Sequence, residues 1–120
     1  MLLLTEDDRR FIVISCGVSG AYIQFASLAE GGVKGEAVSN YYLSGSQKLT
    51  RSTYRELVHL GWLGPRNVGN FFRQWPSPVP ISAIVSLGVK TMRDVFQVPS
   101  PKELKIERGE FPARRELLQR

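Results

Sequence analysis

The side chains best suited to covalent chemistry in this sequence are its single cysteine, Cys16, and its single histidine, His59. A thiol beside an imidazole base is a common nucleophilic pair in enzymes. Cys16 ends an apolar segment and His59 falls in a predicted helix, but no third residue that would orient the imidazole can be nominated. A lone buried cysteine more often serves as a small hydrophobic residue. We therefore expect no catalytic residues and no enzyme.

Signatures of cofactor and metal binding are missing from the sequence as well. Gly31 and Gly32 lie between two predicted strands, where paired glycines suit a tight turn, whereas a phosphate-binding loop joins a strand to a helix. One cysteine and one histidine do not make a common zinc site, and the carboxylates lack the spacing of calcium ligands. The sequence predicts neither a cofactor nor a metal.

Size and composition indicate one globular domain. The chain has 120 residues, of which 42% are hydrophobic and 22% charged. We expect a single domain over residues 1–120, with a core at about 11–107 and a flexible or partner-dependent tail at 108–120. One cysteine cannot form an internal disulfide, and no stretch approaches the roughly 20 apolar residues that cross a bilayer. These features predict a cytoplasmic protein without membrane association.

The net charge of +5 raises the question of nucleic acid. Most basic residues are scattered and accompanied by acidic ones, which favours an ordinary solvated surface. Residues 48–73 are the exception, because Glu56 is their sole acid. A basic stretch with aromatic residues suits single-stranded nucleic acid, so binding through residues 48–75 stays an alternative function.

The strand patterns predict an antiparallel meander. Residues 11–16, 21–29 and 33–43 form apolar or alternating segments that are separated by glycine-rich turns. Residues 104–107 also alternate and are interpreted as a possible edge strand. Residues 5–10 either start a short helix or lead into the first strand.

Two segments carry the helical period. In residues 49–60, Thr50 is the predicted N-cap and Gly61 fits the left-handed position just past the helix end. A second helix is expected from Pro80 to about Phe96, and residues 70–75 between the two are expected to form one helical turn. The sequence thus predicts an α+β fold in which an antiparallel sheet, a three-stranded meander plus the possible edge strand, packs against two main helices.

Aromatic and polar residues give two candidate binding surfaces. Six aromatic residues gather at the end of the third strand and between the helices: Tyr41, Tyr42, Trp62, Phe71, Phe72 and Trp75. They either close one end of the core or line a groove for a partner segment. Tyr22 and Gln24 alternate with core-type residues, and Glu36 follows on the next strand, which fits a sheet face open to solvent.

Several segments, taken in order, resemble a known family. They are Tyr22-Ile23-Gln24-Phe25, Gly35-Glu36-Ala37-Val38-Ser39-Asn40 with Leu43, Leu60-Gly61-Trp62, Asn70-Phe71-Phe72-Arg73-Gln74-Trp75 and Val89-Lys90-Thr91-Met92-Arg93-Asp94-Val95-Phe96. In this order they resemble the actinobacterial branch of the type III secretion chaperone-like domains, also called TY-Chap or YbjN-like peptide-binding domains. The resemblance implies a secretion-chaperone-like α+β fold, no catalytic centre, binding of peptide segments of partner proteins, and in many members a homodimer.

From these patterns we expect a non-catalytic, chaperone-like domain that binds a polypeptide partner. The residues expected to contact the partner are Tyr22, Gln24, Glu36, Tyr42, Phe71, Phe72, Arg73 and Trp75. A homodimer is a further expectation, and nucleic acid is the less favoured partner.

Overall fold

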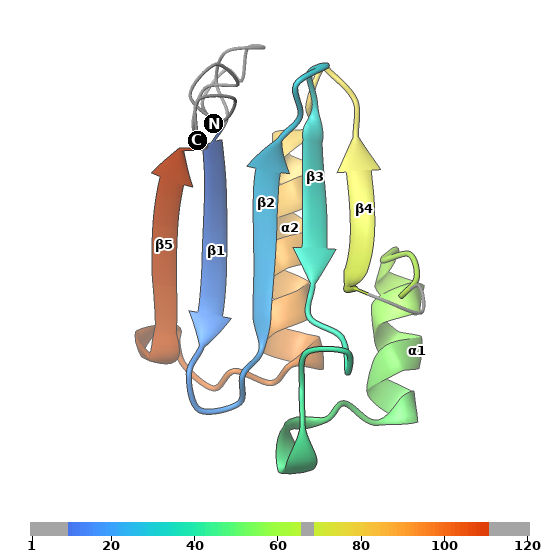
Figure 1. Cartoon of the computed structure of the whole chain (residues 1–120), viewed down its shortest axis with the longest axis vertical. Helices are drawn as coiled ribbons and strands as arrows, with labels where there is room; N and C mark the ends of the chain where they lie inside the picture. Colours follow the sequence, from blue (N-terminus) through green and yellow to red (C-terminus); the bar gives the residue numbers. More distant parts are fainter. Residues whose placement is uncertain (1–9, 66–68, 111–120) are drawn as a thin grey trace, which may run out of the picture.

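Five short segments form one antiparallel sheet (Figure 1). The computed structural model describes residues 10–65 and 69–110. The strands are β1 (Arg10–Cys16), β2 (Tyr22–Ser27), β3 (Val33–Ala37), β4 (Phe71–Trp75) and β5 (Leu104–Glu110). Their order across the sheet is β4-β3-β2-β1-β5. The predicted meander and edge strand are confirmed, and the sheet has a fifth strand that the sequence did not predict.

The unpredicted strand is β4, and it corrects the expectation of a helical turn over residues 70–75. It pairs with β3 from Phe71 opposite Ala37 to Trp75 opposite Val33. Five residues have little conformational preference of their own, and aromatic side chains favour a strand once a sheet edge is there to receive them. The neighbouring strand therefore decides the conformation of this segment.

The third strand ends at Ala37, earlier than the predicted residue 43. Beyond it, side chains replace the sheet as partners of the backbone. The Ser39 N–H donates to Asn70 Oδ1, in the segment before β4, at 3.1 Å. The Asn40 amide brackets Leu49, accepting from its N–H at 2.6 Å and donating to its carbonyl at 3.0 Å. These local bonds turn the chain away from the sheet and toward the first helix.

The first helix, α1 (Arg51–Leu60), has the predicted caps. Thr50 Oγ1 accepts a hydrogen bond from the Thr53 N–H at 3.1 Å. Gly61 adopts a φ of 112°, and the N–H of the next residue, Trp62, bonds back to the Leu57 carbonyl. A short 3₁₀ turn, η1 (Gly45–Gln47), precedes this helix.

The second helix, α2 (Ile81–Lys90), continues as a π-helical turn, η2 (Thr91–Val95), close to the predicted end at Phe96. Thr91 Oγ1 donates to the Leu87 carbonyl at 2.6 Å. A side-chain bond of this kind competes with the helix backbone, which accounts for the altered winding at this point. A 3₁₀ turn, η3 (Pro101–Glu103), then leads into β5.

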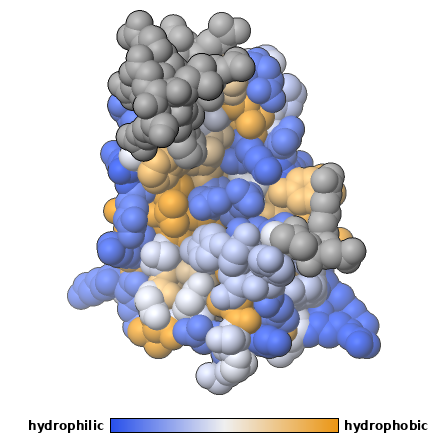
Figure 2. Space-filling view, in the orientation of Figure 1, coloured by the Kyte–Doolittle hydropathy of each residue, from blue (hydrophilic) through white to orange (hydrophobic). Residues whose placement is uncertain are grey.

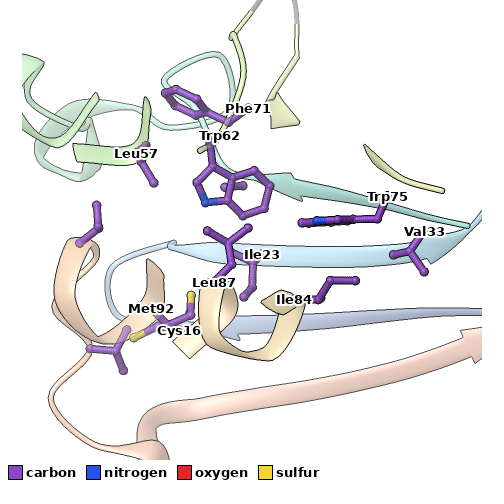
Figure 3. Close-up of a cluster of buried hydrophobic side chains, with 13 residues drawn as sticks. Cys16, Ile23, Val33, Leu57, Trp62, Phe71, Trp75, Ile84, Leu87 and Met92 are labelled. Atoms are coloured by element: carbon purple, nitrogen blue, oxygen red, sulfur yellow. The ribbon is translucent and has the colours of Figure 1, made fainter. Parts of the chain in front are cut away.

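Both helices pack against one face of the sheet, and in Figure 1 α2 lies behind β2 and β3. The core joins sheet residues such as Ile23 and Phe71 to Leu57 of α1 and Leu87 of α2. Trp62 is 1% exposed and lies in the middle of this cluster (Figure 3), where its Nε1–H donates to the Thr91 hydroxyl at 3.0 Å.

Gly88 faces the sheet from α2, near Ile23 and Phe25 of β2. A Cβ at this position would lie 3.4 Å from Ile23 Cδ1, so a larger side chain would push the helix away from β2. A small residue at this position therefore lets α2 approach the sheet closely.

Two expectations concern segments outside the described residues. The short helix or lead-in at residues 5–10 falls there except for Arg10, which begins β1. The expected tail starts at residue 108, whereas β5 continues to Glu110; the remainder of the tail lies outside the described residues.

Candidate functional site

The sheet residues that alternate with the core residues point to the opposite face, which neither described helix covers (Figure 1). We call this surface the open sheet face. It comprises Phe11, Val13 and Ser15 of β1, Tyr22, Gln24 and Ala26 of β2, Lys34 and Glu36 of β3, Phe72 and Gln74 of β4, and Lys105 and Glu107 of β5. Hydrophobic and hydrophilic residues lie side by side on it (Figure 2). It brings together four of the eight predicted site residues: Tyr22, Gln24, Glu36 and Phe72.

A row of directly opposed residues crosses this face perpendicular to the strands. In order, the row is Glu107, Val13, Gln24, Glu36 and Phe72. At its centre Gln24 Nε2 donates a hydrogen bond of 2.7 Å to Glu36 Oε2. Val13 and Phe72 flank this polar pair. The row therefore offers a ligand two apolar contacts with hydrogen-bonding groups between them.

Tyr22 is held in place by the segment that precedes β4. Its hydroxyl accepts a hydrogen bond of 2.9 Å from Asn70 Nδ2, while Asn70 Oδ1 accepts from the Ser39 N–H. Burial raises the pKa of the Tyr22 phenol above its ordinary value, although the Asn70 hydrogen bond acts in the opposite direction. The ring is thus a neutral, fixed part of the open sheet face.

Tyr42 lies beyond the end of β3, in the loop that leads to α1. Its side chain is 56% exposed and packs edge-to-face on Tyr41, with ring centroids 4.9 Å apart. The two tyrosines form an exposed aromatic pair, which is separate from the row across the sheet.

The four predicted residues of β4 are divided between the two faces. Phe71 and Trp75 are 0% and 6% exposed and belong to the core. Arg73 also points to the helix side, where its guanidinium lies 5.4 Å from the Trp75 ring centroid and donates to the Gly61 carbonyl at 3.4 Å. Of the three aromatic residues in β4, only Phe72 lies on the open sheet face. The surface available to a partner is therefore smaller than the sequence suggested.

Two shallow depressions lie outside the core. The larger, of about 600 Å³, runs beside β4 and is lined by Gly61, Leu63, Phe72, Arg73 and Gln74. The smaller, of about 360 Å³, lies on α1 and is lined by Arg51, Tyr54, Arg55, Val58 and His59. Phe72 links the larger depression to the open sheet face. A ligand on that face can therefore extend around the β4 edge.

Sequence reasoning missed Val13 and Leu63 as candidate contacts. Val13 lies in a run of four apolar residues, 11–14, so no alternation of polarity marks its face; the register with Gln24 assigns it. Leu63 is 54% exposed beside β4, and only the antiparallel bridge to Phe72 places it there.

The possible nucleophilic pair is divided between two environments. Cys16 is 3% exposed at the end of β1, whereas His59 is exposed on α1. Hydrogen bonds from the Ser19 N–H and hydroxyl lower the pKa of the Cys16 thiol, against the opposing effect of its burial. Within residues 10–65 and 69–110, no three His, Cys, Asp or Glu side chains are grouped so that they could hold a metal ion.

Comparison with known proteins identifies the family. The model of TY-Chap3, described as type III secretion system (YopN, CesT) and YbjN peptide-binding chaperone 3, matches residues 2–110. The chain belongs to the TY-Chap3 family. This confirms the resemblance of the ordered segments to the TY-Chap domains, and it makes a peptide-binding, chaperone-like role the family's function. No curated protein and no solved structure matched the chain. No helix among the described residues of this TY-Chap3 domain has the length and apolar character needed to span a membrane.

Proposed function

We propose that this TY-Chap3 domain binds an extended segment of a partner protein on its open sheet face, without catalysing a reaction. The observation that carries the proposal is the row across the sheet, in which Val13 and Phe72 flank the hydrogen-bonded pair Gln24 and Glu36. Surfaces that combine apolar anchors with a few placed polar groups are typical of peptide recognition.

The chemistry of the row defines the ligand. Phe72 supplies the largest apolar contact, and it leads into the depression beside β4. The amide oxygen of Gln24 and the second carboxylate oxygen of Glu36 are acceptors for peptide N–H groups. Aromatic anchors carry a large share of the energy at such interfaces. We therefore expect Phe72 to contribute most of the affinity and the polar pair to fix the orientation of the peptide.

The proposal is tested with segments of proteins that co-purify with the domain, synthesised as peptides and titrated by calorimetry. A Phe72→Ala substitution is expected to weaken binding at least about tenfold. Val85→Ala is the matched control, since Val85 is 58% exposed on α2, on the other side of the sheet. Equal affinities of the two variants for every peptide would refute the open sheet face as the binding surface.

Nucleic-acid binding through residues 48–75 is weakened as an alternative. Base stacking requires exposed aromatic rings, but Trp62, Phe71 and Trp75 are buried in the core, which leaves only the partly exposed Tyr54 and Phe72 in this stretch. Gel retardation of single-stranded DNA and RNA at low salt tests this alternative, and we expect no retarded species.

The compartment and the oligomeric state of the domain are part of the same proposal. We propose that the domain has no enzymatic activity and no cofactor and that it works in the cytoplasm. Its single cysteine is buried and forms no disulfide, which suits a reducing compartment. We also propose that two copies of the chain associate into a homodimer, as the family resemblance implies.

A further inference from the structure

The sheet ends in two edges, and the β5 edge exposes backbone groups. In an antiparallel sheet, successive residues of a strand direct their N–H and C=O groups to opposite sides. The Cys16 N–H donates to the Ala21 carbonyl, toward β2, so Ser15 and Val13 bond to β5. Their partners are Lys105 and Glu107. The N–H and C=O groups of Ile106, between these two, therefore point away from the sheet.

The β4 edge is different, because another segment of the chain already pairs with it. The Leu63 N–H donates to the Phe72 carbonyl at 2.9 Å, and the Phe72 N–H donates to the Leu63 carbonyl at 2.9 Å. Among the described residues, nothing comparable lies against β5, where Ile106 is 56% exposed and no proline interrupts the strand. An uncovered edge of this length is a template for a further strand.

The side chains of β5 have a charge pattern that is symmetric in one register. Lys105 and Glu107 lie on the same face of the strand, on either side of Ile106, with Lys105 Nζ 3.2 Å from Glu107 Oε1. If two β5 strands run antiparallel with Ile106 opposite its own copy, each Lys105 lies opposite Glu107 of the second copy. The same register places Leu104 opposite the aliphatic stem of Arg108 of the second copy.

We propose that two copies of this chain associate through β5 in this register, forming one continuous sheet from two five-stranded halves. The inference names the contact of the homodimer proposed above and rests on that part of the proposed function, but it does not depend on peptide binding. Opposite charges directly across a strand pair stabilise it, and like charges destabilise it. Centring the pair on Glu107 would instead place that carboxylate opposite its own copy, and centring it on Arg108 would place two guanidinium groups opposite each other. The charge pattern therefore favours Ile106 over both of these centres.

The symmetry has a consequence for the open sheet face. The two-fold axis that relates antiparallel strands within one sheet runs perpendicular to that sheet. Both open sheet faces therefore lie on the same side of the dimer, next to each other across β5. A single long partner segment, or two segments of one partner, can contact both copies and gain affinity from the second contact.

Charge reversal tests the register by sedimentation equilibrium over a range of concentrations. Lys105→Glu places a second carboxylate opposite Glu107 at two symmetric positions, and we expect self-association to weaken at least about tenfold. Glu107→Lys is expected to do the same. An equimolar mixture of these two variants restores complementary charges at both positions and is expected to form a heterodimer. Lys34→Glu, the same charge change on the central strand β3, is the control and leaves the dimer intact.

A backbone variant tests the edge itself. Ile106→Pro removes an N–H that points outward, so the ladder between β1 and β5 keeps its bonds. The expected result is a monomer with the circular dichroism spectrum of the wild type. A wild-type chain that stays monomeric at all concentrations refutes both the homodimer and this contact. A dimer that withstands both charge reversals and Ile106→Pro refutes the β5 contact alone, and so does failure of the mixed variants to associate.

Discussion

The two faces of the sheet use neighbouring residues for different purposes, and Phe71 and Phe72 show the contrast most clearly. Phe71 is fully buried against Tyr54 of α1, with ring centroids 4.9 Å apart, whereas Phe72 lies half-buried on the open sheet face. Both rings belong to the same short strand. Alternation along the strand places one ring in the core and the other on the open sheet face, where we propose that it contacts a partner.

Each face of the sheet also has a hydrogen-bonded pair of polar side chains, and the two pairs differ in their exposure to solvent. On the covered face, the Trp62 indole and the Thr91 hydroxyl are buried and satisfy each other. On the open sheet face, Gln24 and Glu36 also bond to each other, but they keep further acceptor atoms for a ligand. A polar pair inside the core thus specifies packing, while a similar pair outside it can serve binding.

The sharpest test of this comparison is alanine substitution at the two phenylalanines. Phe71→Ala is expected to lower the free energy of unfolding by about 3–5 kcal/mol, because it leaves a cavity in the core. Phe72→Ala is expected to lower it by about 1 kcal/mol or less, since the ring is only partly removed from solvent. Urea denaturation followed by circular dichroism measures both. Equal losses would mean that the open sheet face is packed as tightly as the covered one.

A smaller effect is expected at the buried polar pair. Thr91→Val keeps the shape of the side chain but removes the acceptor of the Trp62 Nε1–H, and it should lower the free energy of unfolding by about 1–3 kcal/mol. Thr53→Val in α1 is the control, because the Thr53 hydroxyl bonds only in an exposed position. If Thr91→Val is as stable as the wild type, the Trp62 indole has found another acceptor.

The smallest effect concerns Tyr22 and alkaline pH. Its pKa is raised in the folded state by burial, so the neutral phenol stabilises the fold at pH values below its unfolded pKa of about 10. This contribution is lost as the pH rises through the folded pKa. The urea midpoint of the wild type should therefore fall more between about pH 9 and pH 11 than that of Tyr22→Phe. Parallel pH profiles of the two proteins would show that burial does not favour the neutral phenol.

The bounds and caps of the first helix were easier to predict from sequence than the face on which each residue of β4 lies. The helix over residues 49–60 has a capping threonine, a glycine past its end and an apolar stripe, and each signal is local. Phe71 and Trp75 were instead expected at the binding surface, because large aromatic residues are common both in cores and at interfaces. Their exposure depends on which face of β4 lies against the helices. The pairing with β3 decides this, and no local sequence pattern predicts it.

The sequence by itself determined the α+β class, the meander from β1 to β3 and the two caps of α1, because these follow from local spacing and from residues that favour one backbone conformation. The family followed from the resemblance of the ordered segments to known domains. The tertiary structure decided that residues 71–75 form a strand, that Phe71 and Phe72 point to opposite faces, and that Val13, Gln24, Glu36 and Phe72 share a row. Such relations arise from strand register, which joins residues far apart in the chain. A register becomes defined only when burial of one face selects it.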